Sequence, residues 1–332
     1  MMRRVVIAGA SGFIGRVLIA RYEAAGWQVH TIGRSGADAR WGDTAGIAAL
    51  LDGSELLVNL AGKSVNCRYT DANRAEIFRS RLETTAELRR AIAATSSPPS
   101  LWVNSSTATI YRHAEDRPMT ESAGELGSGF SVAVAKAWEA ELFADDLPGT
   151  RRVALRMAIV LGDGSVMPPL VRLARFGLGG PQVDGRWFAT RARRRNGTQH
   201  EFRARAGAQK FSWIHIDDVA GIIDFLVERP DIDGIVNASS PHPSDNRTFM
   251  ATLRRVLGVR LALPARRWML EVGSAVIRTE TELVLKSRWV VPERLSDAGY
   301  PFIWPDLEPA LRDILQPERA AGEGLRSVPR NR

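Results

Sequence analysis

Three glycines near the N-terminus have the spacing that a dinucleotide-binding loop requires. Gly9, Gly12 and Gly15 follow an apolar strand pattern and open the helical pattern of residues 12–26. In such loops the glycines allow a tight turn and close approach of the backbone to a pyrophosphate, which the helix N-terminus attracts. Because the spacing occurs in this context, we predict dinucleotide binding rather than an ordinary strand–helix turn. The predicted cofactor-binding residues of this loop are Gly9, Ser11, Gly12, Phe13, Ile14 and Gly15.

The end of the second predicted strand, residues 27–34, indicates which dinucleotide binds. A cofactor without a 2′-phosphate is usually held there by an acidic residue that bonds the ribose hydroxyls. This strand instead ends in Arg34, with Ser35 beside it. A guanidinium group matches a phosphate and gains little from a neutral ribose, so we predict NADP(H) rather than NAD(H). The alternative is that Arg34 is an ordinary surface residue.

The elements that must position these residues alternate between strand and helix. Buried-strand patterns are separated by helical patterns as far as residue 162, which predicts an α/β fold with a Rossmann-type doubly wound parallel sheet. We therefore assign residues 1–162 to an NAD(P)-binding domain, joined by one further strand near residues 234–239. Residues 163–315 are expected to form a smaller, mostly helical substrate domain. The polar tail, residues 316–332, is predicted to be disordered.

Composition limits the classes of function. The chain has 332 residues, a net charge of +8 and one cysteine, Cys67, so a disulfide framework is excluded and a reducing compartment is favoured. No apolar run is long enough to span a membrane, and the scattered histidines show no metal-ligand spacing. We expect a cytoplasmic protein with no bound metal; a homodimer is left open.

Residues 186–210 hold most of the excess charge, with eight Lys or Arg residues against Glu201 alone. A short basic loop of this kind is usually solvated or covers a substrate. Its aromatic residues Trp187 and Phe202 could stack on bases, but nucleic-acid binding is the least favoured interpretation.

Several motifs in order resemble the extended short-chain dehydrogenase/reductase superfamily, the NAD(P)-dependent epimerases and dehydratases. The motifs are "GFIG", "NLAG", "SSTATIY" and "WIHIDD". The segments "NLAGKSVNCRYT", "SRLETT", "NASSPHPSDNRTFMATL" and "PERLSDAGYPFIWPDLEPAL" resemble the YfcH-like epimerase family more closely. The resemblance implies that Leu60, Ala61 and Gly62 contact the cofactor and that residues 186–210 are an insertion.

In that superfamily a Ser or Thr polarises the substrate oxygen, a Tyr transfers its proton, and a Lys lowers the Tyr pKa. By resemblance Thr107 occupies the first position and Lys136 the last, but the Tyr position falls on Val132. Val has no proton to donate, so this mechanism cannot operate unchanged. The YfcH-like family resembles this chain in lacking the usual Tyr.

Tyr111 is the candidate replacement. If the strand that contains Thr107 continues, residues 107, 109 and 111 lie on the same face. Tyr111 would then share a site with Thr107, and Lys136 would supply positive charge or hold the nicotinamide ribose. Packing of Tyr111 under the second domain is weighed equally.

Four other residues have weaker claims to chemistry. Arg156, near a strand end, is a candidate ligand for an anionic substrate group, with a structural ion pair as an equal alternative. His215, in "WIHIDD", is a candidate substrate contact, although a structural role is favoured. We expect His113 to be solvated in a polar loop and Cys67 to be packed.

Two classes of function follow. The first is an NADP(H)-dependent oxidoreductase or epimerase that acts on a small-molecule substrate and has an atypical active site. The second is a non-catalytic protein that senses NADP(H), which the absence of a Tyr at Val132 suggests.

Overall fold

The computed structural model of the chain describes residues 2–164, 166–185, 187–188, 190–197, 199, 206–276 and 285–316. The predicted tail, apart from residue 316, lies outside the described residues, as does part of the basic segment 186–210. None of the helices in these ranges is long and apolar enough to cross a membrane.

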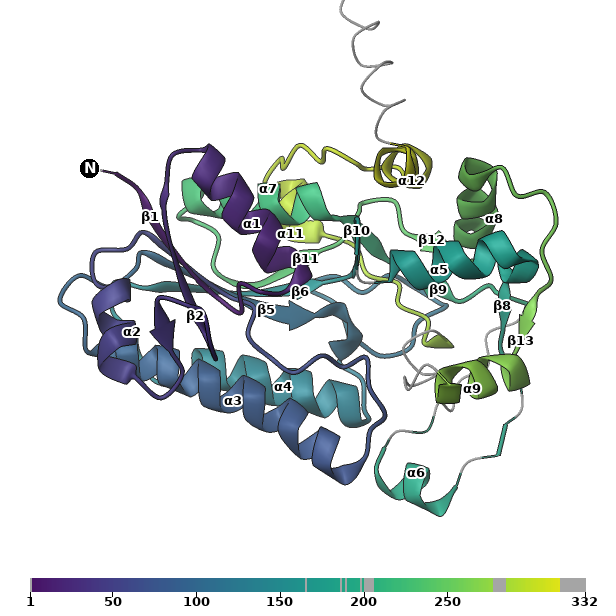
Figure 1. Cartoon of the computed structure of the whole chain (residues 1–332), viewed down its shortest axis with the longest axis horizontal. Helices are drawn as coiled ribbons and strands as arrows, with labels where there is room; N and C mark the ends of the chain where they lie inside the picture. The colour runs from purple at the N-terminus through teal and green to yellow at the C-terminus, as the bar shows by residue number, and fades with distance from the viewer. Residues whose placement is uncertain are drawn as a thin grey trace, which may run out of the picture.

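A seven-stranded parallel sheet forms the centre of the N-terminal half, which confirms the predicted fold class (Figure 1). Its strand order is β11-β6-β5-β4-β1-β2-β3. The strands are β1 (Arg4–Ala8), β2 (Gln28–Gly33), β3 (Ala39–Arg40), β4 (Leu56–Asn59), β5 (Leu101–Thr107), β6 (Arg151–Met157) and β11 (Gly234–Ala238). Strand β11 lies far along the chain, yet it pairs with β6 at the edge of the sheet.

Helices cover both faces of this sheet (Figure 1). Helices α2 (Thr44–Leu51), α3 (Asp71–Ala93) and α4 (Phe130–Phe143) lie on one face, and α1 (Phe13–Ala24) and α7 (Ile216–Glu228) lie on the other. Alternate residues of β1 face the two layers: Val5 and Ile7 pack in one core, and Val6 in the other. This burial on both faces explains the continuous apolar runs of the strands.

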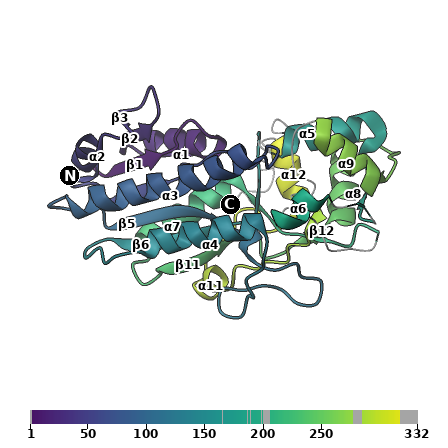
Figure 2. The ribbon, with the colours of Figure 1, turned by 90° about the horizontal axis from the view of Figure 1, so that it is seen from below.

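The C-terminal region contains short helices and strand pairs beside the carboxyl ends of the sheet (Figure 2). Its helices are α5 (Met167–Leu173), a π-helical turn η2 (Ala174–Leu178), α6 (Arg191–Arg195), α8 (Asn246–Leu257), α9 (Arg267–Val276), α11 (Glu293–Asp297) and α12 (Leu307–Leu315). Its strands are β7 (Ile159–Leu161), β8 (Gln182–Val183), β9 (Lys210–Phe211), β10 (Trp213–His215), β12 (Ser244–Asp245) and β13 (Ala265–Arg266). A third apolar cluster, which includes Trp213, Phe249 and Leu311, forms the core of this region.

Candidate functional site

The glycine loop between β1 and α1 has the shape that a pyrophosphate group requires. Gly9 has a φ of 79°, and a Cβ atom there would lie 2.8 Å from the backbone of Leu60 and Ala61. A Cβ atom on Gly15 would lie 2.5 Å from the carbonyl oxygen of Ala10. A residue with a side chain at Gly9 or Gly15 would therefore clash with the backbone of the loop. Gly12 provides no side chain to cap α1, so the helix N-terminus, which Phe13 and Ile14 begin, remains available to an anion.

Arg34 lies directly after β2 and is exposed, as is Ser35. In the described part of the chain Arg34 has no ion pair or side-chain hydrogen bond. The nearby acidic residue, Asp38, accepts hydrogen bonds from the backbone N–H and the hydroxyl of Thr31, both at 2.8 Å. These bonds, chiefly the one from the hydroxyl, lower the pKa of Asp38. The carboxylate of Asp38 is thus held by β2, while the guanidinium of Arg34 remains available to a phosphate.

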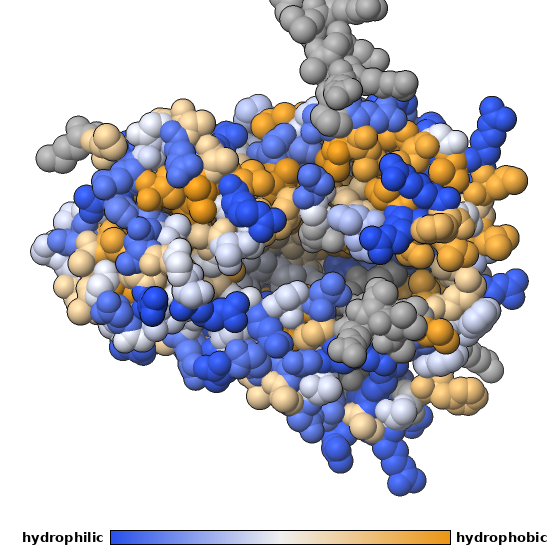
Figure 3. All heavy atoms as spheres, in the orientation of Figure 1, coloured by the Kyte–Doolittle hydropathy of each residue, from blue (hydrophilic) through white to orange (hydrophobic). Residues whose placement is uncertain are grey.

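A cavity of about 280 Å³ lies beyond the carboxyl ends of β4 and β5. Figure 3 shows the molecular surface hollowed between the sheet and the C-terminal region. The loop after β4 contributes Leu60, Ala61 and Gly62 to the cavity wall, and β5 contributes Thr107. Polar groups thus meet in a concave site at the sheet edge where ligands bind in open α/β folds.

Thr107 ends β5 and lines this cavity. Its hydroxyl oxygen accepts a hydrogen bond from the backbone N–H of Thr109 at 3.1 Å, which leaves the hydroxyl proton for a ligand. Lys136, on α4, is exposed, and its Nζ donates to the carbonyl oxygen of Gly127 at 3.1 Å. That bond uses one of three ammonium protons.

The strand β5 does not continue to Tyr111, so the condition for a shared face is not met. The strand ends at Thr107, and a 3-10 turn, η1 (Ala108–Ile110), follows because the Thr107 hydroxyl caps it. Thr107 and Tyr111 therefore do not share a face by strand alternation. Tyr111 is only 1% exposed and belongs to the core.

Tyr111 forms part of a buried polar network rather than the cavity wall. Its hydroxyl donates to Asn237 Oδ1 at 2.9 Å and accepts from Arg156 Nη1 at 2.9 Å. Burial raises the pKa of Tyr111, which opposes the loss of its proton. Arg156 makes two further bonds to the carboxylate of Glu139, at 2.7 and 2.8 Å. Of the two roles considered for Arg156, the structure therefore shows the structural ion pair.

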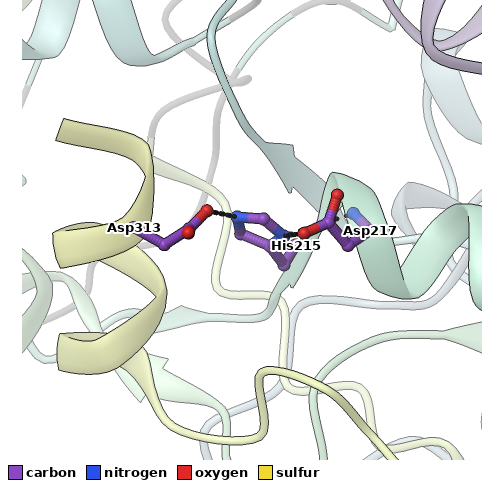
Figure 4. Close-up of side chains that lie close together, drawn as sticks. All are labelled: His215, Asp217 and Asp313. Carbon is purple, nitrogen blue, oxygen red and sulfur yellow. Dashed lines mark hydrogen bonds and ion pairs between the residues drawn. The ribbon is translucent and has the colours of Figure 1, made fainter. Parts of the chain in front are cut away.

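His215 also lies inside the protein. It is 2% exposed, ends β10 and caps α7, with Nδ1 accepting from the backbone N–H of Asp217 at 3.2 Å. Its Nε2 lies 3.4 Å from Asp313 of α12, and its ring contacts Trp304. Figure 4 shows the imidazole between the Asp217 and Asp313 carboxylates, with one carboxylate at each ring nitrogen. This arrangement connects α7 with α12, and His215 is not among the residues that line the cavity of Thr107.

Of two minor residues, one differs from the sequence expectation and the other agrees with it. His113 is not solvated: its side chain is 11% exposed, and its Nδ1 accepts from the backbone N–H of Ser287 at 3.1 Å. Cys67 is partly buried against the small apolar cluster of Tyr69, Ile77, Phe130 and Val134, as expected of a packed residue.

The structure also places in the cavity wall several side chains to which sequence analysis gave no role. Arg81 of α3 and Phe130 and Trp138 of α4 line its wall. The segment "SRLETT", which contains Arg81, was notable only as part of a family resemblance. An Arg among polar helix residues gives no signal of where its side chain points.

Comparison with known proteins identifies the family of the chain. A model of the NAD dependent epimerase/dehydratase family matches residues 5–238. The chain belongs to this family. Residues 267–314 match a second model, the domain of unknown function DUF1731.

Relatives within the epimerase family span nearly the whole chain. The human epimerase family protein SDR39U1 is 32% identical over 326 residues, which cover 94% of this chain and 99% of the human protein. The epimerase family protein YfhF of Bacillus subtilis is 26% identical, covering 94% and 97% of the two chains. The crystal structure of human SDR39U1 (isoform 2) with NADPH has a TM-score of 0.79 and 30% identity, covering 94% and 98%.

Proposed function

We propose that this protein is an NADP(H)-dependent oxidoreductase of the epimerase type, with its reaction site in the cavity of Thr107. The carrying observation is that Arg34, beyond β2, is exposed and unpaired in the described structure while Asp38 is held by Thr31. This arrangement favours a 2′-phosphate over a free ribose hydroxyl. The crystallisation of human SDR39U1 with NADPH supports the same cofactor.

Different residues would bind the cofactor and polarise the substrate. The glycine loop and the N-terminus of α1 would hold the pyrophosphate, and the loop of Leu60, Ala61 and Gly62 would support the cofactor towards the cavity. A bound NADP(H) would supply or accept a hydride there. Thr107 would donate its free hydroxyl proton in a hydrogen bond to a carbonyl or hydroxyl oxygen of the substrate.

Proton transfer must differ from that of a Tyr-based enzyme. Val132 is buried in the core and has no proton to give, and Tyr111 is committed to Arg156 and Asn237. A water molecule bonded to Thr107 is the proton carrier that the cavity accommodates, because the cavity opens to solvent. Lys136 would hold the nicotinamide ribose with the protons that Gly127 does not take.

Fluorescence titration of the purified protein with NADPH and NADH tests the cofactor assignment. We expect NADPH to bind at least about tenfold more tightly than NADH, and Arg34→Ala to remove most of that difference, because one charge-assisted contact is worth about 1.5–3 kcal/mol. Arg90→Ala, which removes an exposed Arg of α3, is the matched control and should bind like the wild type. Equal affinity for both nucleotides in the wild type would refute the assignment.

A non-catalytic NADP(H) sensor is the second candidate, favoured by the burial of both Val132 and Tyr111. Measuring the turnover of NADPH with a panel of carbonyl compounds and nucleotide sugars distinguishes the enzyme from the sensor. An enzyme should lose turnover in Thr107→Val while keeping its NADPH affinity. A sensor should show no turnover, and Thr107→Val should leave its cellular role intact.

A further inference from the structure

Arg81 is a cation of the cavity wall that has no acidic partner in the described part of the chain. It lies in the middle of α3 and is partly buried. Its Nη1 donates to the carbonyl oxygens of Lys63, at 3.0 Å, and Ile77, at 3.1 Å. No side-chain hydrogen bond or ion pair from its Nε or Nη2 to another described residue is present. Its guanidinium carbon lies 4.9 Å from the centre of the Trp138 ring.

An arrangement of this kind is costly for a protein. Arg side chains are seldom buried without a carboxylate, because the charge loses its hydration. Burial lowers the pKa of Arg81 to about 10, with only small opposing effects from Tyr69 and Cys67, so the group is still charged at neutral pH. Two carbonyl bonds through one nitrogen do not use the planar donor fork of a guanidinium.

The loop that contains Gly62 packs closely against the guanidinium of Arg81. Gly62 lies in the loop after β4. A Cβ atom at this position would lie 3.1 Å from the guanidinium carbon of Arg81, which is a tight contact. A Cβ atom at Gly62 would therefore require the guanidinium to shift by a few tenths of an ångström. The loop expected to support the cofactor thus lies directly against Arg81, and both line the same cavity.

A described part of the basic segment is bonded to a residue of the cavity wall. The carbonyl oxygen of Gly197 accepts a hydrogen bond from the backbone N–H of Phe130, a cavity-lining residue, at 3.0 Å. The preceding helix α6 carries Arg191, Arg194 and Arg195, which are exposed. Cations near the entrance of a cleft raise the local concentration of anions.

We propose that Arg81 is an anion-binding residue of the cavity, which holds a phosphoryl or carboxylate group of the bound ligand through its free donor atoms. An anion would supply the opposite charge that the partly buried guanidinium does not find among the described residues, and the planar fork would donate to two of its oxygens. The substrate class that this selects is a small phosphorylated or carboxylated compound. The proposed function enters only in identifying the cavity as the substrate pocket; anion binding itself needs no cofactor.

Calorimetric titration of the full chain with inorganic phosphate at low ionic strength tests this inference. We expect one phosphate to bind to the wild type and the affinity of Arg81→Gln to fall about tenfold or more. Arg79→Gln is the matched control: Arg79 is two residues away on α3, exposed and paired with Glu76 and Glu83, and its loss should leave phosphate binding unchanged. Phosphate affinity in Arg81→Gln equal to that of the wild type would overturn the proposal.

Two further variants separate the alternatives. Arg81→Lys keeps the charge without the fork, so it should fold if Arg81→Gln does not, and its phosphate affinity should be intermediate. Saturation with NADPH identifies the source of the anion: phosphate that still binds marks a substrate group, and phosphate that is displaced marks a cofactor phosphate. Failure of NADPH to bind would count against the proposed function alone, since the phosphate titration is made without the cofactor.

Discussion

Tyr111→Phe separates a structural Tyr from a catalytic one. The substitution removes only the hydroxyl, which donates to Asn237 and accepts from Arg156 inside the core. It therefore leaves a buried amide oxygen and a guanidinium N–H without their partner. An unsatisfied buried polar group costs about 1–3 kcal/mol, so we expect the free energy of unfolding to fall by about that amount.

Urea unfolding followed by tryptophan fluorescence measures this change, and thermal unfolding should show a decrease of roughly 2–6 °C in Tm. Arg156→Met provides a graded comparison, because it leaves the buried carboxylate of Glu139 without its cation and should cost about 3–5 kcal/mol. NADPH affinity should stay the same in Tyr111→Phe. A variant with wild-type stability and no turnover would show instead that Tyr111 acts in catalysis and that the buried network is not its main role.

The remaining predictions concern the missing tyrosine and pH. Val132→Tyr should not restore a proton donor, because Val132 is 1% exposed and packs in the core; we expect a loss of about 1–3 kcal/mol in urea unfolding and no gain in turnover. The Thr31 hydroxyl lowers the pKa of Asp38, so the stability that Asp38 contributes is present above its unfolded pKa of about 3.9 and is lost as pH falls through the lower folded value. Acid unfolding of Asp38→Ala should lack this dependence below about pH 4, whereas a pH profile identical to that of the wild type would contradict it.

The parts of the fold that depend on local patterns could be predicted from the sequence. Apolar runs bounded by glycine predict the strands of a parallel sheet, since burial on both faces removes any alternation. The glycine spacing after β1 predicts the loop because two of its glycines, Gly9 and Gly15, stand where a Cβ atom would clash with backbone. The position of Arg34 could also be predicted from the local pattern, because Arg34 directly follows the strand β2.

The parts that depend on distant contacts could not be predicted. The hydroxyl of Tyr111 bonds to Asn237, which is 126 residues away in the sequence. The short turn after Thr107 depends on one hydroxyl that caps the backbone, which competes with the strand tendency of the apolar residues around it. Arg81 resembles any charged residue of an amphipathic helix until the loop of Gly62 is placed against it.

In the proposed site, Val132 and Arg81 would act in opposite directions. By the family resemblance Val132 stands where a Tyr would donate a proton, whereas Arg81 places a cation in the wall that Thr107 also lines. A transition state can be stabilised by a fixed charge and a hydrogen bond as well as by full proton transfer, because each reduces the cost of negative charge on the substrate oxygen. In a site of this kind, transition-state stabilisation would depend less on proton transfer and more on the negative charge of the substrate. A Val at position 132 is thus compatible with catalysis on an anionic substrate in the proposed site.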